Sequence, residues 1–259
     1  MKKLIWLCSS PTPYNDCLFG ALNEILDLNL EVVYREFYLY SHPWQRKKSN
    51  TYRSRQLSKL GGFDLDLLKK ILFEKNITYV VGGWHPKFWC LILALSLKSS
   101  KFIVWSDTPN DLLVRGPLKE IVRNFWLKLI FKNSHAILGT GSPCVDKFIS
   151  MGADKSKVFN FPLWIPLKPV PHSDKRINGS KFKVISIGRL ESIKGLEYLV
   201  KAANIVKKIN PLLDIQYKIC GDGPLRNDLE TLIEAHSLTS SFIITGWLEH
   251  DVVLEELES

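Results

Sequence analysis

Short apolar runs alternate along the chain with segments in which apolar residues recur at helical spacing. The runs are rich in β-branched and aromatic residues, as in strands that a sheet buries on both faces, and they span residues 4–8, 30–34, 77–81, 102–105, 136–138 and 158–161. Between them the spacing predicts a helix capped by Asn15, helices over 63–74, 86–97 and 117–131, and a helix over 144–151 capped by Ser142. This alternation predicts a doubly wound α/β domain over residues 1–165.

The pattern is interrupted and then restarts. Residues 166–180 hold several prolines and the run Asn178-Gly179-Ser180, which is typical of a linker. After it we expect strands at 183–187, 215–220 and 242–245 and helices at 194–208, 225–236 and 251–257. A doubly wound sheet has about six strands. Residues 181–259 are therefore expected to form a second, incomplete Rossmann-like domain.

Composition narrows the class of protein. The chain is 46% hydrophobic and 24% charged, which excludes intrinsic disorder. Its five cysteines are scattered and never spaced as C-x-x-C, so we expect neither a disulfide framework nor a zinc site. No apolar stretch approaches the roughly 20 residues of a membrane span. We therefore expect a cytoplasmic protein.

Charge is distributed unevenly. Residues 1–170 hold 24 basic and 13 acidic side chains, whereas residues 171–259 hold 11 and 13. The basic side chains of residues 44–60, interleaved with aromatic ones, are Arg46, Lys47, Lys48, Arg53, Arg55 and Lys59, beside Trp44 and Tyr52. Such a segment fits peripheral contact with a membrane surface or a polyanion, or a solvated loop. No nucleic-acid-binding motif is present, so nucleic acid is not an expected partner.

The most specific local motif runs from Gly188 to Gly195, between a predicted strand and a predicted helix. Ligands of doubly wound sheets bind beyond the carboxyl ends of the strands. Arg189 leaves that end, and Lys194 is expected on the first turn of the helix, where the helix dipole favours an anion. This pair of cations suits a diphosphate, which Arg can grip with two hydrogen bonds. The alternative is two solvated loop cations.

A second turn, Gly221-Asp222-Gly223-Pro224, follows the next predicted strand. Its glycines allow a tight turn and close approach of the backbone to a ligand, and Pro224 suits the first position of a helix. A purely structural β–α turn is the alternative.

Together these motifs resemble the donor domain of the family 4 retaining glycosyltransferases, which have the GT-B fold. The residues that carry the resemblance are Gly188-Arg189-Leu190, Lys194-Gly195, Ile219 to Pro224 and Thr245-Gly246, with a looser likeness at Pro11 to Leu22, Gly82-Gly83-Trp84 and Ser106-Asp107-Thr108. The resemblance implies two Rossmann-like domains and transfer of a sugar from a nucleotide-sugar, with retention and without a metal or bound cofactor. The acceptor would be a glycan or a lipid-linked molecule. Members of this kind serve bacterial surface polysaccharide synthesis, some of them at the inner face of the cytoplasmic membrane.

The resemblance also implies roles for particular residues. Gly188, Arg189, Lys194 and the turn from Gly221 to Pro224 would bind the donor, and Arg189 and Lys194 would stabilise the leaving nucleotide. Asp107 would be a catalytic or acceptor-side group, or else a cap of the following turn. His85 would contact the acceptor, or else serve only as a helix-entry residue. No His, Cys and carboxylate set has metal-ligand spacing.

Three departures from the family pattern weigh against activity. The acidic E-x7-E motif is absent, Ser106-Asp107 stands where many members carry a histidine, and Ser9 to Pro13 stands in place of a glycine-rich loop. We therefore expect a C-terminally truncated chain. The alternative function is an inactive fragment or a non-catalytic protein that binds a nucleotide or polyanion.

Overall fold

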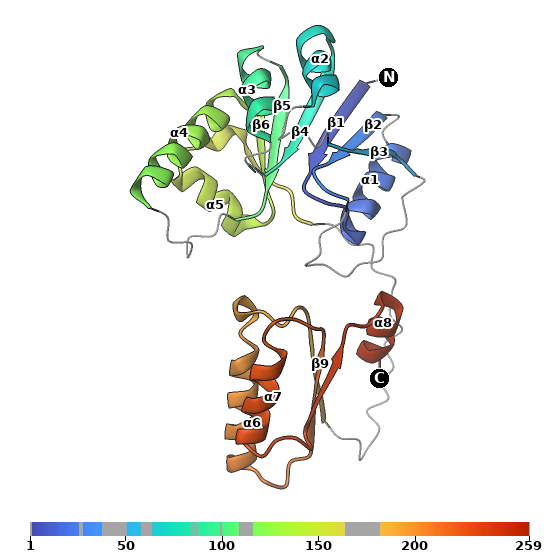
Figure 1. The fold of residues 1–259 in the computed structure, drawn as a ribbon, viewed down its shortest axis with the longest axis vertical. Coiled ribbons are helices and arrows are strands. Elements are labelled where there is room, and N and C mark those ends of the chain that lie inside the picture. The colour runs from blue at the N-terminus through green and yellow to red at the C-terminus, as the bar shows by residue number, and fades with distance from the viewer. Residues whose placement is uncertain are drawn as a thin grey trace. The chain divides into compact units, whose positions relative to one another are not determined.

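The computed structural model describes residues 2–25, 28–37, 51–57, 64–83, 85, 88–98, 100–108, 116–163 and 182–258. The chain divides into two compact units, Met1–Leu167 and Lys168–Ser259 (Figure 1). The linker expected over 166–180 lies outside the described residues. No helix in the described ranges is long and apolar enough to cross a membrane.

The first unit alternates strands and helices along the chain. Its elements are β1 (Lys2–Cys8), α1 (Pro13–Ile25), β2 (Leu28–Tyr34), β3 (Arg53–Gln56), α2 (Leu65–Phe73), β4 (Ile77–Gly82), α3 (Trp89–Leu97), β5 (Phe102–Ser106), α4 (Pro117–Asn133), β6 (Ala136–Gly139), α5 (Ser142–Ser150), a 3-10 helix (Lys155–Lys157) and β7 (Val158–Asn160). All strand pairings are parallel, in the order β3-β2-β1-β4-β5-β6-β7. The order reverses between β1 and β4, which makes the carboxyl ends of these two strands the switch point of the sheet.

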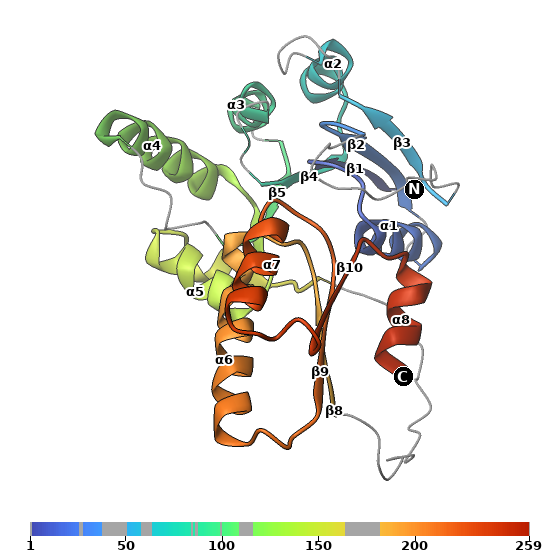
Figure 2. The same ribbon diagram turned by 60° about the horizontal axis from the view of Figure 1, so that its bottom comes forward.

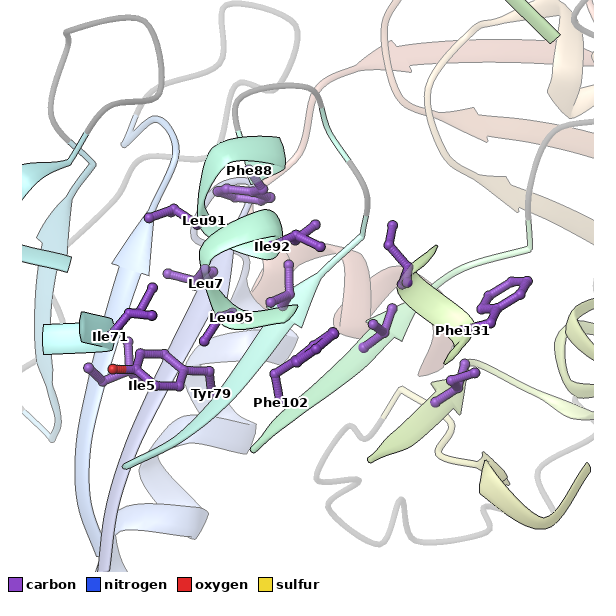
Figure 3. Close-up of a cluster of buried hydrophobic side chains, with 14 of the residues drawn as sticks. Ile5, Leu7, Ile71, Tyr79, Phe88, Leu91, Ile92, Leu95, Phe102 and Phe131 are labelled. Carbon is purple, nitrogen blue, oxygen red and sulfur yellow. The ribbon is translucent and has the colours of Figure 1, made fainter. Parts of the chain in front are cut away.

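Helices cover both faces of this sheet, and successive residues of β1 supply both layers. Ile5 and Leu7 join a core with α2, α3, α4 and α5, part of which Figure 3 shows. Trp6 and Cys8 join a second core with Phe19 of α1. Figure 2 shows α1 on one side of the sheet and α2, α3 and α4 on the other. The continuous apolar run of β1 follows from this double burial.

The second unit repeats the pattern on a smaller scale. Its elements are β8 (Phe182–Ile187), a 3-10 helix (Ser192–Lys194), α6 (Leu196–Ile209), β9 (Ile215–Cys220), α7 (Arg226–Ala235), β10 (Phe242–Gly246) and α8 (His250–Glu258). The three strands are parallel in the order β10-β9-β8. Helices α6 and α7 lie on one face and α8 on the other (Figure 2), where Lys218 of β9 pairs with Glu256 at 2.6 Å. The predicted α/β fold class, with parallel Rossmann-like sheets, is confirmed.

Four local predictions are wrong. Pro224 does not occupy the first position of a helix, because α7 begins at Arg226 and its N-cap is Leu225. Asn15 does not cap the first helix, because α1 begins at Pro13. Instead the Thr12 hydroxyl oxygen accepts a hydrogen bond of 3.3 Å from the backbone N–H of Asn15. Ser142 lies inside α5, whose N-cap is Gly141. Lys194 lies in the 3-10 helix and not in α6, because Gly195 adopts a left-handed conformation with φ 62° and separates the two. Glycine adopts that conformation without strain.

The basic segment holds a strand that its sequence does not predict. Arg53–Gln56 has no apolar run because β3 is an edge strand paired only with β2. Arg55 donates hydrogen bonds to Glu31 at 3.0 Å and to Asp64 at 2.7 Å, so its guanidinium group is held by carboxylates of the same unit. Tyr52 is 7% exposed and its hydroxyl donates to Asp16. These two side chains are therefore unavailable to a membrane or polyanion. Arg53 is exposed, and residues 44–50 and 58–60 lie outside the described residues.

Candidate functional site

A cavity of about 280 Å³ lies at the switch point of the first sheet. Polar groups line it from the ends of four strands: Ser9 and Ser10 after β1, Gly82 and Gly83 at β4, Ser106 and Asp107 at β5, and Thr140 after β6. Thr12, Tyr14 and Asn15, around the start of α1, also line it. Open α/β sheets bind ligands at this position.

Asp107 lines this cavity. Its carboxylate is exposed, and Oδ1 accepts a hydrogen bond of 2.6 Å from the Thr140 hydroxyl. The Asp107 backbone oxygen accepts from the Ser106 hydroxyl at 3.2 Å. Asp107 is therefore held by the neighbouring strand end, across the sheet. Thr140 was not identified from the sequence, although a polar residue directly after a strand was the available signal.

The first turn of α1 brings a second group to the cavity. Asn15 is 7% exposed, and its side-chain oxygen is buried without a hydrogen-bond partner among the described residues. An unsatisfied buried amide oxygen is costly, by about 1–3 kcal/mol. A ligand hydroxyl or ammonium would remove that cost. Sequence reasoning assigned Asn15 only to capping and missed this position.

Two other side chains near these strand ends differ from Asp107 in their surroundings. Burial raises the pKa of the Cys8 thiol far above its usual range, so the thiol beside the cavity stays neutral and is not an activated nucleophile. His85 does not line the cavity among the described residues. Its carbonyl accepts from the Phe88 amide at 2.8 Å and its ring meets the Phe88 ring edge-on, as a helix-entry residue would.

In the second unit, the turn after β8 positions both predicted cations. Gly188 has φ 153°, and a side chain there would approach the Lys194 Cε at 3.9 Å, so the Lys194 stem lies close to the turn. Lys194 is exposed. Arg189 is partly buried and pairs with Glu191, with Nη2 and Oε1 2.6 Å apart. The two cations therefore flank one turn, and one of them is held by a carboxylate two residues away.

The Gly221–Pro224 turn packs directly on the Gly188 turn. A Cβ at Gly221 would lie 1.9 Å from the Gly188 carbonyl oxygen, and one at Gly223 would lie 2.6 Å from that of Leu190. The Leu190 amide donates to the Asp222 carbonyl at 3.0 Å. These glycines are thus required for backbone-to-backbone packing of the two turns. The Asp222 carboxylate lies 3.5 Å from Arg226.

Two parallel sheets with polar or cationic turns at the carboxyl ends of their strands place the chain among the Rossmann-like α/β proteins. Within that class, residues 170–259 match the family model described as Glycosyl transferases group 1. Residues 170–259 are therefore similar to glycosyltransferase domains, in agreement with the resemblance expected from the motifs around Gly188 and Gly221.

Individual relatives agree with this assignment. The chain is 40% identical over 70 residues to the alpha-D-kanosaminyltransferase of Streptomyces kanamyceticus, covering 27% of this chain and 18% of that protein. It is 30% identical over 143 residues to the 2-deoxystreptamine N-acetyl-D-glucosaminyltransferase of Niallia circulans, covering 52% and 36%. The matches thus span well under half the length of these relatives.

Solved structures share the fold at low sequence identity. The Anabaena protein HepE in complex with UDP has a TM-score of 0.68 at 13% identity, over 99% of this chain and 72% of that chain. The lipopolysaccharide outer core galactosyltransferase WaaB has a TM-score of 0.61 at 11% identity, over 99% and 72%. This likeness concerns the fold.

Proposed function

We propose that the protein transfers a sugar from a nucleotide-sugar donor to an acceptor hydroxyl, with retention at the anomeric carbon. The observation that carries this proposal is the pair Arg189 and Lys194 on one turn of the domain that matches the glycosyltransferase family. HepE, the structural neighbour, was solved with UDP, which supports a nucleoside diphosphate as the ligand of this turn.

Arg189 and Lys194 would act on the leaving group. As the bond to the sugar breaks, negative charge develops on the diphosphate, and two fixed cations stabilise that charge more than they stabilise the bound donor. Arg189 can grip two phosphate oxygens at once, while Lys194 supplies a point charge. We propose that these cations do the work that a metal does in other transferases, so no metal is required. The described residues contain no group of three His, Cys, Asp or Glu that could hold one.

The turn from Gly221 to Pro224 would complete the donor site. Its backbone lies against the Gly188 turn because neither Gly221 nor Gly223 has a side chain to separate them. The donor site in this proposal is therefore Gly188, Arg189, Lys194 and the backbone of the second turn.

The acceptor would occupy the switch-point cavity of the first unit. Thr140 holds Oδ1 of Asp107 at 2.6 Å, so Oδ2 can accept a hydrogen bond from an acceptor hydroxyl. Asn15 and the serines after β1 add further polar groups to the lining. A cavity lined by hydroxyls, an amide and one carboxylate suits a polyhydroxylated acceptor. Glycans and lipid-linked sugars of bacterial surface polysaccharides have this chemistry, and 2-deoxystreptamine, which the name of the Niallia circulans relative contains, is a further candidate.

Peripheral membrane contact, expected at residues 44–60, finds better support on α4. Leu118, Ile121 and Phe125 are 65–73% exposed and recur at helical spacing on one stripe with Val122. Lys128 is exposed on the same helix. An apolar stripe with lysines beside it is typical of a helix that lies in the membrane interface. We propose that this stripe rests on the inner face of a membrane that carries a lipid-linked acceptor.

The membrane contact is tested by sedimentation with phosphatidylglycerol vesicles. We expect Ile121→Gln with Phe125→Gln to abolish binding. The matched control replaces two exposed apolar residues of the second unit, Ile209→Gln with Leu212→Gln. Equal binding of both double variants would exclude α4 as the contact.

The activity is tested by assaying the chain with a panel of nucleotide-sugars and with calorimetry of UDP and GDP. We expect turnover in the parent and none in Arg189→Ala or Lys194→Ala, with Lys201→Ala as a control on exposed charge. Nucleotide binding without turnover in the folded parent would favour the alternative function, a non-catalytic nucleotide-binding chain. Equal nucleotide affinity in the parent and Arg189→Ala would remove the donor-site assignment.

A further inference from the structure

A second cavity, of about 640 Å³, lies at the amino ends of the strands of the first sheet, whereas Asp107 lies at their carboxyl ends. The amino ends of β1, β4 and β5 form it, at Lys2, residues 76–79 and Lys101. The ends of α2 and α3, at residues 71–75 and Lys98, complete it. No part of the proposed transfer reaction uses this edge.

Lysines surround this cavity. Lys2, Lys75, Lys98 and Lys101 all line it and are exposed, and no ion pair joins any of them to another described residue. The one carboxylate among the described lining residues is Glu74, which already pairs with Lys3 at 2.7 Å. The lining is thus cationic, with its acidic group already satisfied.

The helix ends do not cancel this charge. The carboxyl ends of α2 and α3 each carry about half a negative charge, which lysines often complement. Together with Glu74 they offset about two of the five lysine charges, counting Lys3. About three positive charges therefore remain around the cavity after the helix ends and Glu74 have been neutralised.

A buried hydroxyl group, that of Tyr79, also lines this cavity. Tyr79 of β4 is 2% exposed and lines the cavity, and its hydroxyl has no hydrogen-bond partner among the described residues. Figure 3 shows the Tyr79 ring beside Ile5 in the apolar core. Burial, and to a lesser extent Glu74 and Glu31, raise the pKa of this hydroxyl, so it keeps its proton and can only gain by donating to an acceptor.

We propose that this cavity binds a multiply charged phosphate anion, held by Lys98 and Lys101 with Lys2 and Lys75, and accepting a hydrogen bond from Tyr79. A diphosphate or a phosphorylated headgroup balances the residual charge, whereas a single carboxylate does not. This site is separate from the donor turn, since it lies wholly within the first unit.

Inorganic pyrophosphate is the probe, titrated by calorimetry at low ionic strength, because salt screens exposed lysines. The full chain carries Arg189→Ala and Lys194→Ala so that the turn after β8 does not contribute. We expect Lys98→Gln with Lys101→Gln to weaken pyrophosphate binding by about tenfold or more. The matched control, Lys201→Gln with Lys208→Gln, should bind as the parent does.

Tyr79→Phe separates a ligand-binding hydroxyl from a merely structural one. Without ligand, the variant should melt at or above the temperature of the parent, because it loses an unsatisfied buried group. With pyrophosphate, the increase in melting temperature should be smaller than in the parent. An unchanged pyrophosphate increase would remove Tyr79 from the site.

Phosphatidylcholine vesicles with and without phosphatidylglycerol distinguish the source of the phosphate. Vesicle binding that Lys98→Gln with Lys101→Gln abolishes would identify a lipid headgroup, and pyrophosphate binding alone would identify a soluble anion. The vesicles are tested with Ile121→Gln and Phe125→Gln also present in the chain, so that α4 does not contribute. The proposal is overturned if neither pyrophosphate nor the vesicles bind, or if Lys98→Gln with Lys101→Gln binds the probe as tightly as Lys201→Gln with Lys208→Gln does.

Discussion

The Thr140 hydroxyl donates a hydrogen bond of 2.6 Å to Oδ1 of Asp107, across the carboxyl ends of β5 and β6. The two residues are 33 positions apart in sequence and meet because β5 and β6 are neighbours in the sheet. The bond fixes one oxygen of the only carboxylate among the described residues that line the cavity.

Replacing Thr140 by valine keeps the shape of the side chain and removes this bond. We expect kcat/KM for the acceptor to fall about tenfold, as for the loss of a hydrogen bond to a charged group, with the nucleotide affinity unchanged. Thr140→Ser keeps the hydroxyl and should restore most of the activity. A fall in nucleotide affinity equal to the fall in kcat/KM would point to general unfolding instead.

The ion pair of Arg189 and Glu191 competes with the proposed diphosphate. A partly exposed pair of this kind is worth about 0–1 kcal/mol, so Glu191→Gln should raise UDP affinity by up to about fivefold. Calorimetry measures this, with Glu197→Gln on the first turn of α6 as a control for charge alone. Weaker binding in Glu191→Gln would show instead that Glu191 orients Arg189 for the ligand.

The turn at Gly221–Pro224 packs closely on the turn at Gly188, so a methyl group at Gly223 should lower the free energy of unfolding. Its Cβ would lie 2.6 Å from the Leu190 carbonyl oxygen, so the backbone must shift. We expect Gly223→Ala to destabilise the second unit by about 1–3 kcal/mol, measured by urea unfolding through the fluorescence of Trp247. Gly116→Ala, where the added methyl meets open space, is the control. Equal stability of Gly223→Ala and the parent would mean that the turns adjust freely.

The lowered pKa of Glu31 predicts that part of the stability of the first unit is lost at acidic pH. Burial alone would raise the pKa of Glu31, but hydrogen bonds from Lys70 and Arg55 outweigh it and hold the pKa below the usual 4.5. The interactions of ionised Glu31 with Lys70 and Arg55 therefore stabilise the fold above about pH 4.5. This contribution is lost as the pH falls through the lowered pKa of Glu31.

Urea unfolding between about pH 6 and 3 measures that loss. Glu31→Gln should be less stable than the parent at neutral pH by about 1–3 kcal/mol, and the difference should shrink as the pH falls. Glu24→Gln, an exposed position on α1, should follow the parent. A constant difference between Glu31→Gln and the parent would contradict the assignment.

Much of the fold could be predicted because its strands are buried on both faces. The run at Leu4–Cys8 is apolar throughout and lies within β1. The run at Ile77–Val81 is apolar except for Thr78 and lies within β4. Strand β3 could not be predicted, since an edge strand whose Arg55 is paired with Glu31 carries no apolar run. The start of α6 was missed because Gly195 interrupts the helical pattern only through its left-handed conformation.

The sequence by itself determined that two parallel α/β units form and that Arg189 and Lys194 flank one turn, because apolar runs and short-range spacing are local properties of the chain. The tertiary structure alone decided which distant residues meet. It placed Thr140 on Asp107, buried the Asn15 oxygen at the cavity, and gathered Lys2, Lys75, Lys98 and Lys101 around Tyr79. Those groupings depend on strand order, which is set by packing across the whole sheet and leaves no periodic signal in any one segment.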